Sequence, residues 1–246
     1  MIAGFVVLES RLRNPIMPLR ILRLRSLTGA SITRSFVFAG MFTNFFVGAL
    51  YLQHIRGLSA FETGLAFLPT SLMLAALSAG LSARLMVRFG ARNLAVAGLV
   101  GIGTALLLLS GADAQSSYFP RIFAAYLLFG LGGGLAFMPL LSISMSEVPA
   151  ADAGLAAGFG NVTMQMGAAI GLAALGAIST AHAQTLIAQG QTVSAALTGG
   201  YQLAFLLAAI CVLVGLVVVL MVIRPSGGGA GRPVRVELDR AEAEAA

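Results

Sequence analysis

Long apolar stretches alternate with short polar or glycine-containing segments along this chain of 246 residues. An α-helix rises about 1.5 Å per residue and the hydrocarbon core of a bilayer is about 30 Å thick, so a membrane-spanning helix needs about 20 mostly apolar residues. No stretch has the period of two that a spanning β-strand requires. The pattern predicts an all-α integral membrane protein of six transmembrane helices, at residues 35–52, 63–83, 94–111, 121–145, 153–179 and 201–223.

The ends of the chain differ in composition from this core. Residues 1–34 are predicted to be a cytoplasmic segment leading into the first helix, and their opening MIAGFVV looks like the remnant of a preceding helix. Residues 35–223 form the predicted six-helix transmembrane domain. Residues 224–246 are rich in Gly, Pro and charge, which predicts a disordered cytoplasmic tail. Residues 181–200 are polar without net charge and are predicted to be the only long outer loop.

Composition excludes a soluble globular protein. The chain is 58% hydrophobic and 10% charged, whereas roughly a quarter of the residues of a soluble domain are charged. Its mean hydropathy is +0.93. The net charge of +6 comes from arginine, and in a membrane protein such charge sets topology, so no nucleic-acid partner is expected. The lipid bilayer is the predicted surrounding.

Arginine is distributed unevenly between the predicted loops. Thirteen of the fifteen arginines precede the first span, lie between the second and third spans, or follow the sixth. Cytoplasmic loops retain Arg, so the pattern predicts a multi-pass protein of the inner (plasma) membrane with both termini in the cytoplasm. Arg34 stands at the inner boundary of the first span and is expected to reach lipid phosphates, with a buried functional charge as the less favoured alternative.

Groups for catalysis or proton relay are missing from the predicted membrane centre. The acids and histidines near the spans all stand at span ends: Glu62, Asp113, Glu147, Asp152, His54 and His182. No Ser/His/Asp set, metal cluster or carboxylate pair can be assembled on one side of the membrane. The sequence therefore predicts no enzyme activity, no metal and no cofactor.

The predicted loop between the second and third spans reads GLSARLMVRFGARN. It resembles the cytoplasmic loop signature of the major facilitator superfamily, Gly-x-x-x-Asp-Arg-x-Gly-Arg, in which a tight turn and arginines form a breakable contact with a carboxylate or a helix end. Here Arg84 takes the acidic position, so a plain positively charged loop is the alternative. The motif residues are Gly80, Arg84, Arg88, Gly90 and Arg92.

A broader resemblance covers residues 1–224. The ordered segments PIMPLRILRLRSL, YLQHIRGLSAFETGLAFLP, LLFGLGGGLAFMPL and VPAADAGLAAGFGNVTMQMGAAIG are similar to the last six helices of the fourteen-helix drug:proton antiporter branch of that superfamily. The resemblance implies two three-helix units, as in one half of such a transporter, and multidrug efflux. One position departs from the family, which commonly has Arg before Gln where this chain has Met164 before Gln165.

Polar side chains indicate which spans line a path. The third and sixth spans are almost wholly apolar, as lipid-facing helices can be, and the resemblance places the first and fourth at the central cavity. Phe42, Phe45, Phe46, Phe123 and Phe137 are candidates for its aromatic walls. The candidate substrate-cavity residues are Thr43, Asn44, Tyr51, Tyr126, Asn161 and Gln165.

Three close spacings on the fifth span share helix faces. Asn161 and Gln165 stand four residues apart, so they are expected to face the protein interior, where they contact substrate or bond to a neighbouring helix. Gly154 with Gly158, and Gly167 with Gly171, are expected to let helices approach closely.

Three functional hypotheses follow. The first is the C-terminal half of a proton-coupled antiporter that exports small amphipathic or lipophilic molecules, whose partner is a missing N-terminal half carrying the coupling carboxylates. The second is a homodimer in which a second copy of the chain supplies the other wall. The third is a non-transporting remnant or assembly partner.

Overall fold

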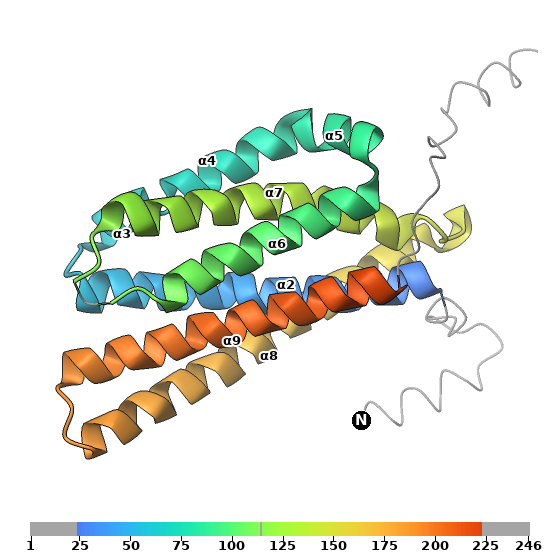
Figure 1. The fold of residues 1–246 in the computed structure, drawn as a ribbon. Coiled ribbons are helices and arrows are strands. Elements are labelled where there is room, and N and C mark those ends of the chain that lie inside the picture. Colours follow the sequence, from blue (N-terminus) through green and yellow to red (C-terminus); the bar gives the residue numbers. More distant parts are fainter. Residues whose placement is uncertain (1–23, 114, 223–246) are drawn as a thin grey trace, which may run out of the picture.

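The computed structural model describes residues 24–113 and 115–222, and no strand occurs in these ranges (Figure 1). Residues 1–23 and the predicted tail lie outside the described residues, as does the proposed remnant of an earlier helix. Within these ranges, five helical segments are long and apolar enough to cross a membrane. The α-helices of the described residues are α2 (Arg25–Leu50), α3 (Ala60–Ala66), α4 (Leu68–Ala76), α5 (Ser82–Phe89), α6 (Ala91–Ser110), α7 (Phe123–Met145), α8 (Ala153–Ala188) and α9 (Val193–Val222).

The first span begins earlier than predicted. α2 starts at Arg25 rather than near residue 35, and a π-helical turn, Tyr51–Ile55, extends it at the other end. The first part of α2 contains polar residues and arginine, a composition typical of a loop. Ser26 and Thr33 are nevertheless buried against other helices, so packing extends the helix beyond the wholly apolar stretch.

The second predicted span, 63–83, is not one continuous helix. Ser59 begins α3 with a reciprocal capping box to Glu62, which satisfies free N–H groups at the helix start. The helix is then interrupted at Phe67, and Pro69 stands in the first turn of α4. Proline is tolerated there because the N–H groups of a first turn have no partner within the helix. A π-helical turn, Leu77–Leu81, separates α4 from α5. The continuous apolar helix in this region, Ala60–Ala76, is too short to count as a membrane span. Five candidate spans are therefore found among the described residues where six were predicted.

The predicted long outer loop is also wrong. α8 continues to Ala188 and α9 starts at Val193, so residues 181–188 and 193–200 are helical and only a short turn joins them. Gly190 has a φ of +88° in this turn, a conformation that glycine adopts without strain. The polar residues of 181–188 and 193–200 therefore continue α8 and α9 beyond their apolar stretches and do not form a loop.

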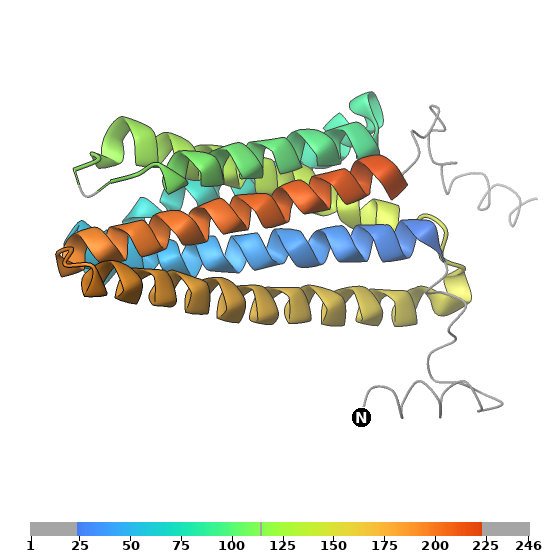
Figure 2. The same ribbon diagram turned by 60° about the horizontal axis from the view of Figure 1, so that its bottom comes forward.

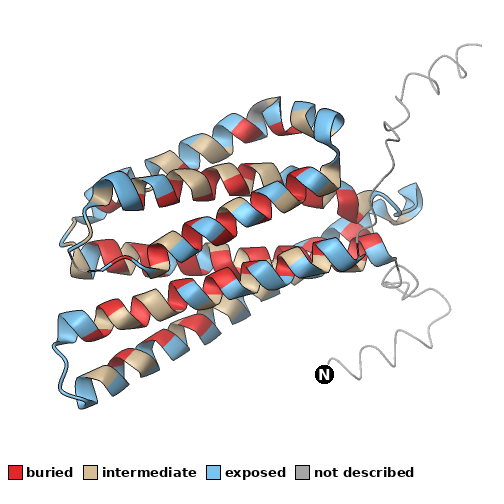
Figure 3. Cartoon of the chain, in the orientation of Figure 1, coloured by how far each residue is buried: buried red, intermediate tan, exposed pale blue. Residues whose placement is uncertain are grey.

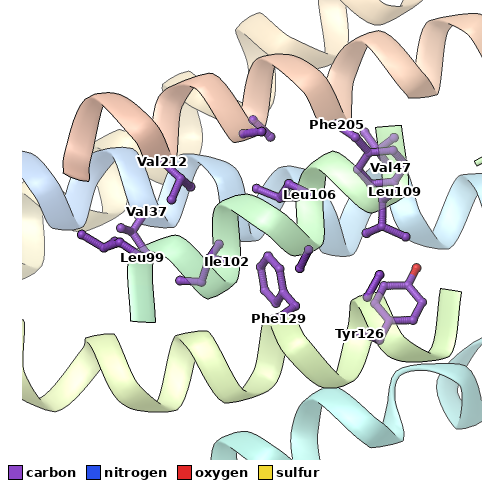
Figure 4. Packing of buried hydrophobic residues seen from close by; sticks show 14 of the residues in the cluster. Val37, Val47, Leu99, Ile102, Leu106, Leu109, Tyr126, Phe129, Phe205 and Val212 are labelled. Carbon is purple, nitrogen blue, oxygen red and sulfur yellow. The ribbon is translucent and has the colours of Figure 1, made fainter. Parts of the chain in front are cut away.

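The helices pack along their lengths into a bundle (Figures 1 and 2). α2 contacts α7, α8 and α9, while α6 packs between α7 and α9, and α4 lies against α7. The main core lies where α2, α6, α7 and α9 meet (Figure 4). Large apolar side chains fill it, among them Val37, Val47, Leu99, Ile102, Leu106, Leu109, Phe129, Phe205 and Val212.

Glycines on α8 pack closely against α2 at one of the two predicted pairs. A Cβ at Gly167 would lie 2.6 Å from the backbone of Ser35, and one at Gly171 would overlap Ala39. This pair therefore permits close helix contact, as predicted. At Gly154 and Gly158, a Cβ would have no atom of another part of the described chain within 4 Å, so no described helix packs against them and their packing role stays a prediction.

α8 is the least buried of the long helices (Figure 3). Only 17% of its most apolar stretch is buried, against 50% for α2. Its exposed side includes large apolar side chains, namely Val162, Met166, Ile170 and Ile178. One face of the bundle is therefore apolar and has no covering helix among the described residues.

Candidate functional site

An apolar pocket of about 180 Å³ lies between α2, α7, and α4 with the π-helical turn that follows it. Nine of its twelve lining residues come from α2 and α7, and α9 supplies none. The first and fourth spans, which were predicted to line a cavity, thus line this pocket. The lining residues are Arg34, Val37, Phe38, Met41, Leu74, Ser78, Ile102, Phe129, Gly133, Ala136, Phe137 and Leu140.

The pocket walls are held by contacts between α4 and α7. The Thr70 hydroxyl donates a buried hydrogen bond to the carbonyl oxygen of Tyr126 at 2.8 Å. A Cβ at Gly130 would overlap the backbone of Thr70, so this glycine lets the two helices touch. Across the pocket, the rings of Phe38 and Phe137 lie with their centroids 6.2 Å apart. These contacts place α4 and α7 side by side with aromatic rings between α7 and α2.

Arg34 lies inside the bundle, and the favoured expectation that it reaches lipid phosphates is wrong. Its side chain is only 6% exposed. Nη2 lies 3.3 Å from the sulfur of Met164, and the guanidinium carbon lies 5.8 Å from the centroid of the Phe137 ring. Met164 stands where the resemblance implies an arginine on α8. The guanidinium of Arg34, which belongs to α2, lies next to that position instead.

Four of the predicted cavity residues are buried in the bundle and do not line this pocket. The hydroxyl of Tyr51 donates to the carbonyl oxygen of Asp113 at 2.7 Å. The side-chain polar atoms of Thr43, Asn44 and Tyr126 are buried without a hydrogen-bond partner among the described residues. Their role in substrate passage stays a prediction.

The two predicted cavity residues on α8 are placed differently. Asn161 and Gln165 are exposed on that helix, and no hydrogen bond joins them to another described residue. They therefore do not bond to a neighbouring helix of the described chain. They lie on the helix that is least covered, and contact with substrate remains a prediction.

The loop motif forms a tight connection. Gly90, with a φ of +81°, is the single residue between α5 and α6, and Gly80 has a φ of +111° within the π-helical turn. Arg84 and Arg88 are exposed. Arg92 donates from Nη2 to the carbonyl oxygen of Leu220 at 3.1 Å, near the end of α9. This is the helix-end contact that the motif predicts for its arginines.

Sequence reasoning missed most of the pocket lining, although Phe137 was among its candidate aromatic walls. A signal was present in the spacing. Arg34, Phe38 and Met41 recur at intervals of four and three residues, which places them on one helix face. Phe129, Gly133 and Phe137 recur every four residues on α7 in the same way, but periodicity alone does not distinguish a pocket face from a core face.

Titratable groups lie mainly at the helix ends. The Ser116 hydroxyl donates to Oδ1 of Asp113 at 2.7 Å, in the turn after α6, and lowers the pKa of that carboxyl below its ordinary value. Among the described residues, no group of three or more His, Cys, Asp or Glu side chains is arranged to hold a metal ion.

Comparisons with known proteins agree with the sequence resemblance. Residues 30–243 match the family model described as Major Facilitator Superfamily. A puromycin resistance protein of Streptomyces alboniger is 33% identical over 81% of this chain and 40% of its own length. A multidrug resistance protein of Mycobacterium tuberculosis is 35% identical over 73% of this chain and 33% of its own length. A cephamycin export protein of Amycolatopsis lactamdurans is 32% identical over 70% of this chain and 36% of its own length. The chain thus spans well under half the length of these relatives.

Proposed function

Since the chain belongs to the major facilitator superfamily, we propose that it forms one wall of a two-walled pathway that exports small amphipathic molecules. The observation that carries this proposal is the apolar pocket lined mainly by α2 and α7. Ligand pockets for lipophilic molecules have such apolar and aromatic linings with few polar groups. The names of relatives concerned with puromycin, cephamycin and multiple drugs support export as the direction.

The uncovered face of α8 supports the need for a second wall. Asn161 and Gln165 are exposed on α8, as are large apolar side chains such as Ile170, which is 62% exposed. Two amides turned toward lipid would each lose on the order of 1 kcal/mol or more, because hydrocarbon offers no hydrogen-bond partner. A second wall that encloses a water-containing path would satisfy both amides and cover the apolar side chains.

The proposed partner is an N-terminal six-helix half that carries the coupling carboxylates of a proton antiporter. Among the described residues, the carboxylates stand at helix ends: Glu62, Asp113, Glu147 and Asp152. A proton relay needs titratable groups at membrane depth, so the relay would lie in the partner. The assembly would reside in the inner membrane with both termini of this chain in the cytoplasm, as its arginine distribution favours.

Reconstitution tests this proposal. The chain is placed in liposomes alone and together with the N-terminal half of the puromycin resistance relative, and extrusion of a lipophilic dye is followed under an imposed proton gradient. We expect gradient-dependent transport only when both halves are present. Each half alone is the control for leakage. Dye transport by this chain at a density of one molecule per liposome would contradict the two-walled proposal.

The uncovered α8 face also fits a second copy of this chain, related by two-fold symmetry. Ile170→Cys on that face and Leu213→Cys on α9 form a matched pair of variants, each made with Cys211→Ala. Crosslinking between two copies at position 170, but not at position 213, would favour the homodimer over the separate half. No transport with any partner would favour a non-transporting assembly protein.

A further inference from the structure

Arg34 is the one buried cation among the described residues. It lines the pocket, and its Nε has no hydrogen-bond partner in the described part of the chain. Its contacts are the thioether of Met164 and the ring of Phe137. A thioether is a weak acceptor and a ring is neutral, whereas a guanidinium keeps its charge in proteins. The pocket therefore carries a positive charge that no anionic side chain of the described residues neutralises.

The described residues that face this guanidinium are all neutral. Gly160 and Met164 face it from α8, and Phe137 faces it from α7. A Cβ at Gly160 would lie only 3.2 Å from Nη1 of Arg34, so glycine leaves the space that the guanidinium occupies. The second polar residue of the pocket lining, Ser78, is also uncharged. The charge of Arg34 thus has no anionic partner among the described residues, and the rest of the pocket lining is apolar apart from Ser78.

The shape of the pocket restricts the size of that anion. Its volume is about 180 Å³, and an apolar cavity of about 150 Å³ accepts a benzene molecule. Val37, Ile102 and Phe129 supply apolar walls beyond the charged end. An aromatic ring fits among them, and a carboxylate on that ring would meet Arg34.

We propose that this pocket binds small aromatic monoanions, with the carboxylate paired to Arg34 and the ring held by the apolar walls. The proposal rests on the function proposed above, because it names a substrate class for the same pocket. A carboxylate and a guanidinium form two parallel hydrogen bonds, which are stronger than bonds between neutral groups. A neutral ligand leaves the buried charge uncompensated, and a cationic ligand adds repulsion between like charges.

Ligand binding to the full chain in lipid nanodiscs tests the proposal. Fluorine NMR titrations at pH 7 compare 4-fluorobenzoate with 4-fluorobenzamide, which has nearly the same size and no charge. We expect the wild-type chain to bind the anion at least about tenfold more tightly, as a charge-assisted hydrogen bond implies. Arg34→Met should abolish this preference and retain amide binding, which shows that the pocket is intact. Arg88→Met, at an exposed arginine, is the matched control and should keep the wild-type preference.

Two results would overturn the anion site. They are equal binding of both compounds by the wild-type chain, or an unchanged anion preference in Arg34→Met. The outcome is separable from that of the transport assay: anion preference without transport would refute the proposed function alone, and dye transport with equal binding would refute the anion site alone.

Discussion

The crossing of α6 and α7 depends on two glycines that bring the helix backbones together. A Cβ at Gly98 would lie 2.6 Å from the amide nitrogen of Ala136 and 2.6 Å from the carbonyl oxygen of Gly132. A Cβ at Gly132 would likewise lie 2.6 Å from the carbonyl oxygen of Gly98. The obstructing atoms belong to backbone, so no side-chain rotation relieves the overlap. Gly98→Ala is therefore expected to push the two helices apart.

The same helix provides a matched control. A Cβ at Gly103 would meet a single atom within 4 Å, Cδ2 of Leu213 at 3.9 Å, which is ordinary contact. Each Gly→Ala change favours the helix by about 1 kcal/mol through propensity, so this gain cancels when the variants are compared. Overpacking a well-packed interior destabilises by about 1–3 kcal/mol. Gly98→Ala should therefore be about 1–3 kcal/mol less stable than Gly103→Ala.

Unfolding in mixed micelles measures this difference. Titration with dodecyl sulfate is followed by circular dichroism, and a thiol-reactive dye on the half-buried Cys211 of α9 gives an independent signal. Both signals should show Gly98→Ala unfolding at the lower detergent fraction. Equal stability of the two variants, or a more stable Gly98→Ala, would refute the backbone-to-backbone crossing of α6 and α7.

Three further predictions concern single contacts. Thr70→Val removes the hydrogen bond to the Tyr126 carbonyl oxygen and should lower the free energy of unfolding by about 0.6–1.7 kcal/mol; an unchanged unfolding midpoint would contradict this. Ser116→Ala should raise the pKa of Asp113 toward its ordinary value in a carboxyl NMR titration. Because the folded pKa is lowered, this carboxylate stabilises the turn above the unfolded pKa and loses that effect as pH falls through the folded pKa. Arg92→Gln should speed amide hydrogen exchange at the C-terminal end of α9 only, and uniform exchange along α9 would speak against its anchoring contact.

The order of apolar helices, the membrane character and the family could all be predicted from the sequence, because hydrocarbon imposes a length and an apolar composition on each span. Helix ends could not. Arg25 and Ser26 look like loop residues, yet α2 includes them because Ser26 is buried and its amide nitrogen lies 3.3 Å from Oε2 of Glu147. The break at Phe67 likewise depends on local geometry that apolar composition does not reveal.

The sequence indicated the two helices that supply most of the pocket lining, but of the lining residues it indicated only Phe137. Polarity pointed to Thr43 and Asn44, which lie in the buried interior away from the pocket. The pocket itself is lined mainly by apolar side chains and by Arg34, which the sequence placed at the membrane boundary. Burial of that guanidinium depends on where α7 and α8 pack against α2, and spacing within one helix does not contain this information.

The central claim is that the uncovered face of α8 borders a water-containing path. Asn161→Cys in a Cys211→Ala background tests it in native membranes, with a membrane-impermeant maleimide applied from each side in turn. The proposed function predicts labelling by this reagent from at least one side, and protection by a lipophilic substrate. Labelling by a lipid-soluble maleimide alone, with none by the impermeant reagent from either side, would show that this face of α8 lies against lipid and would contradict the claim.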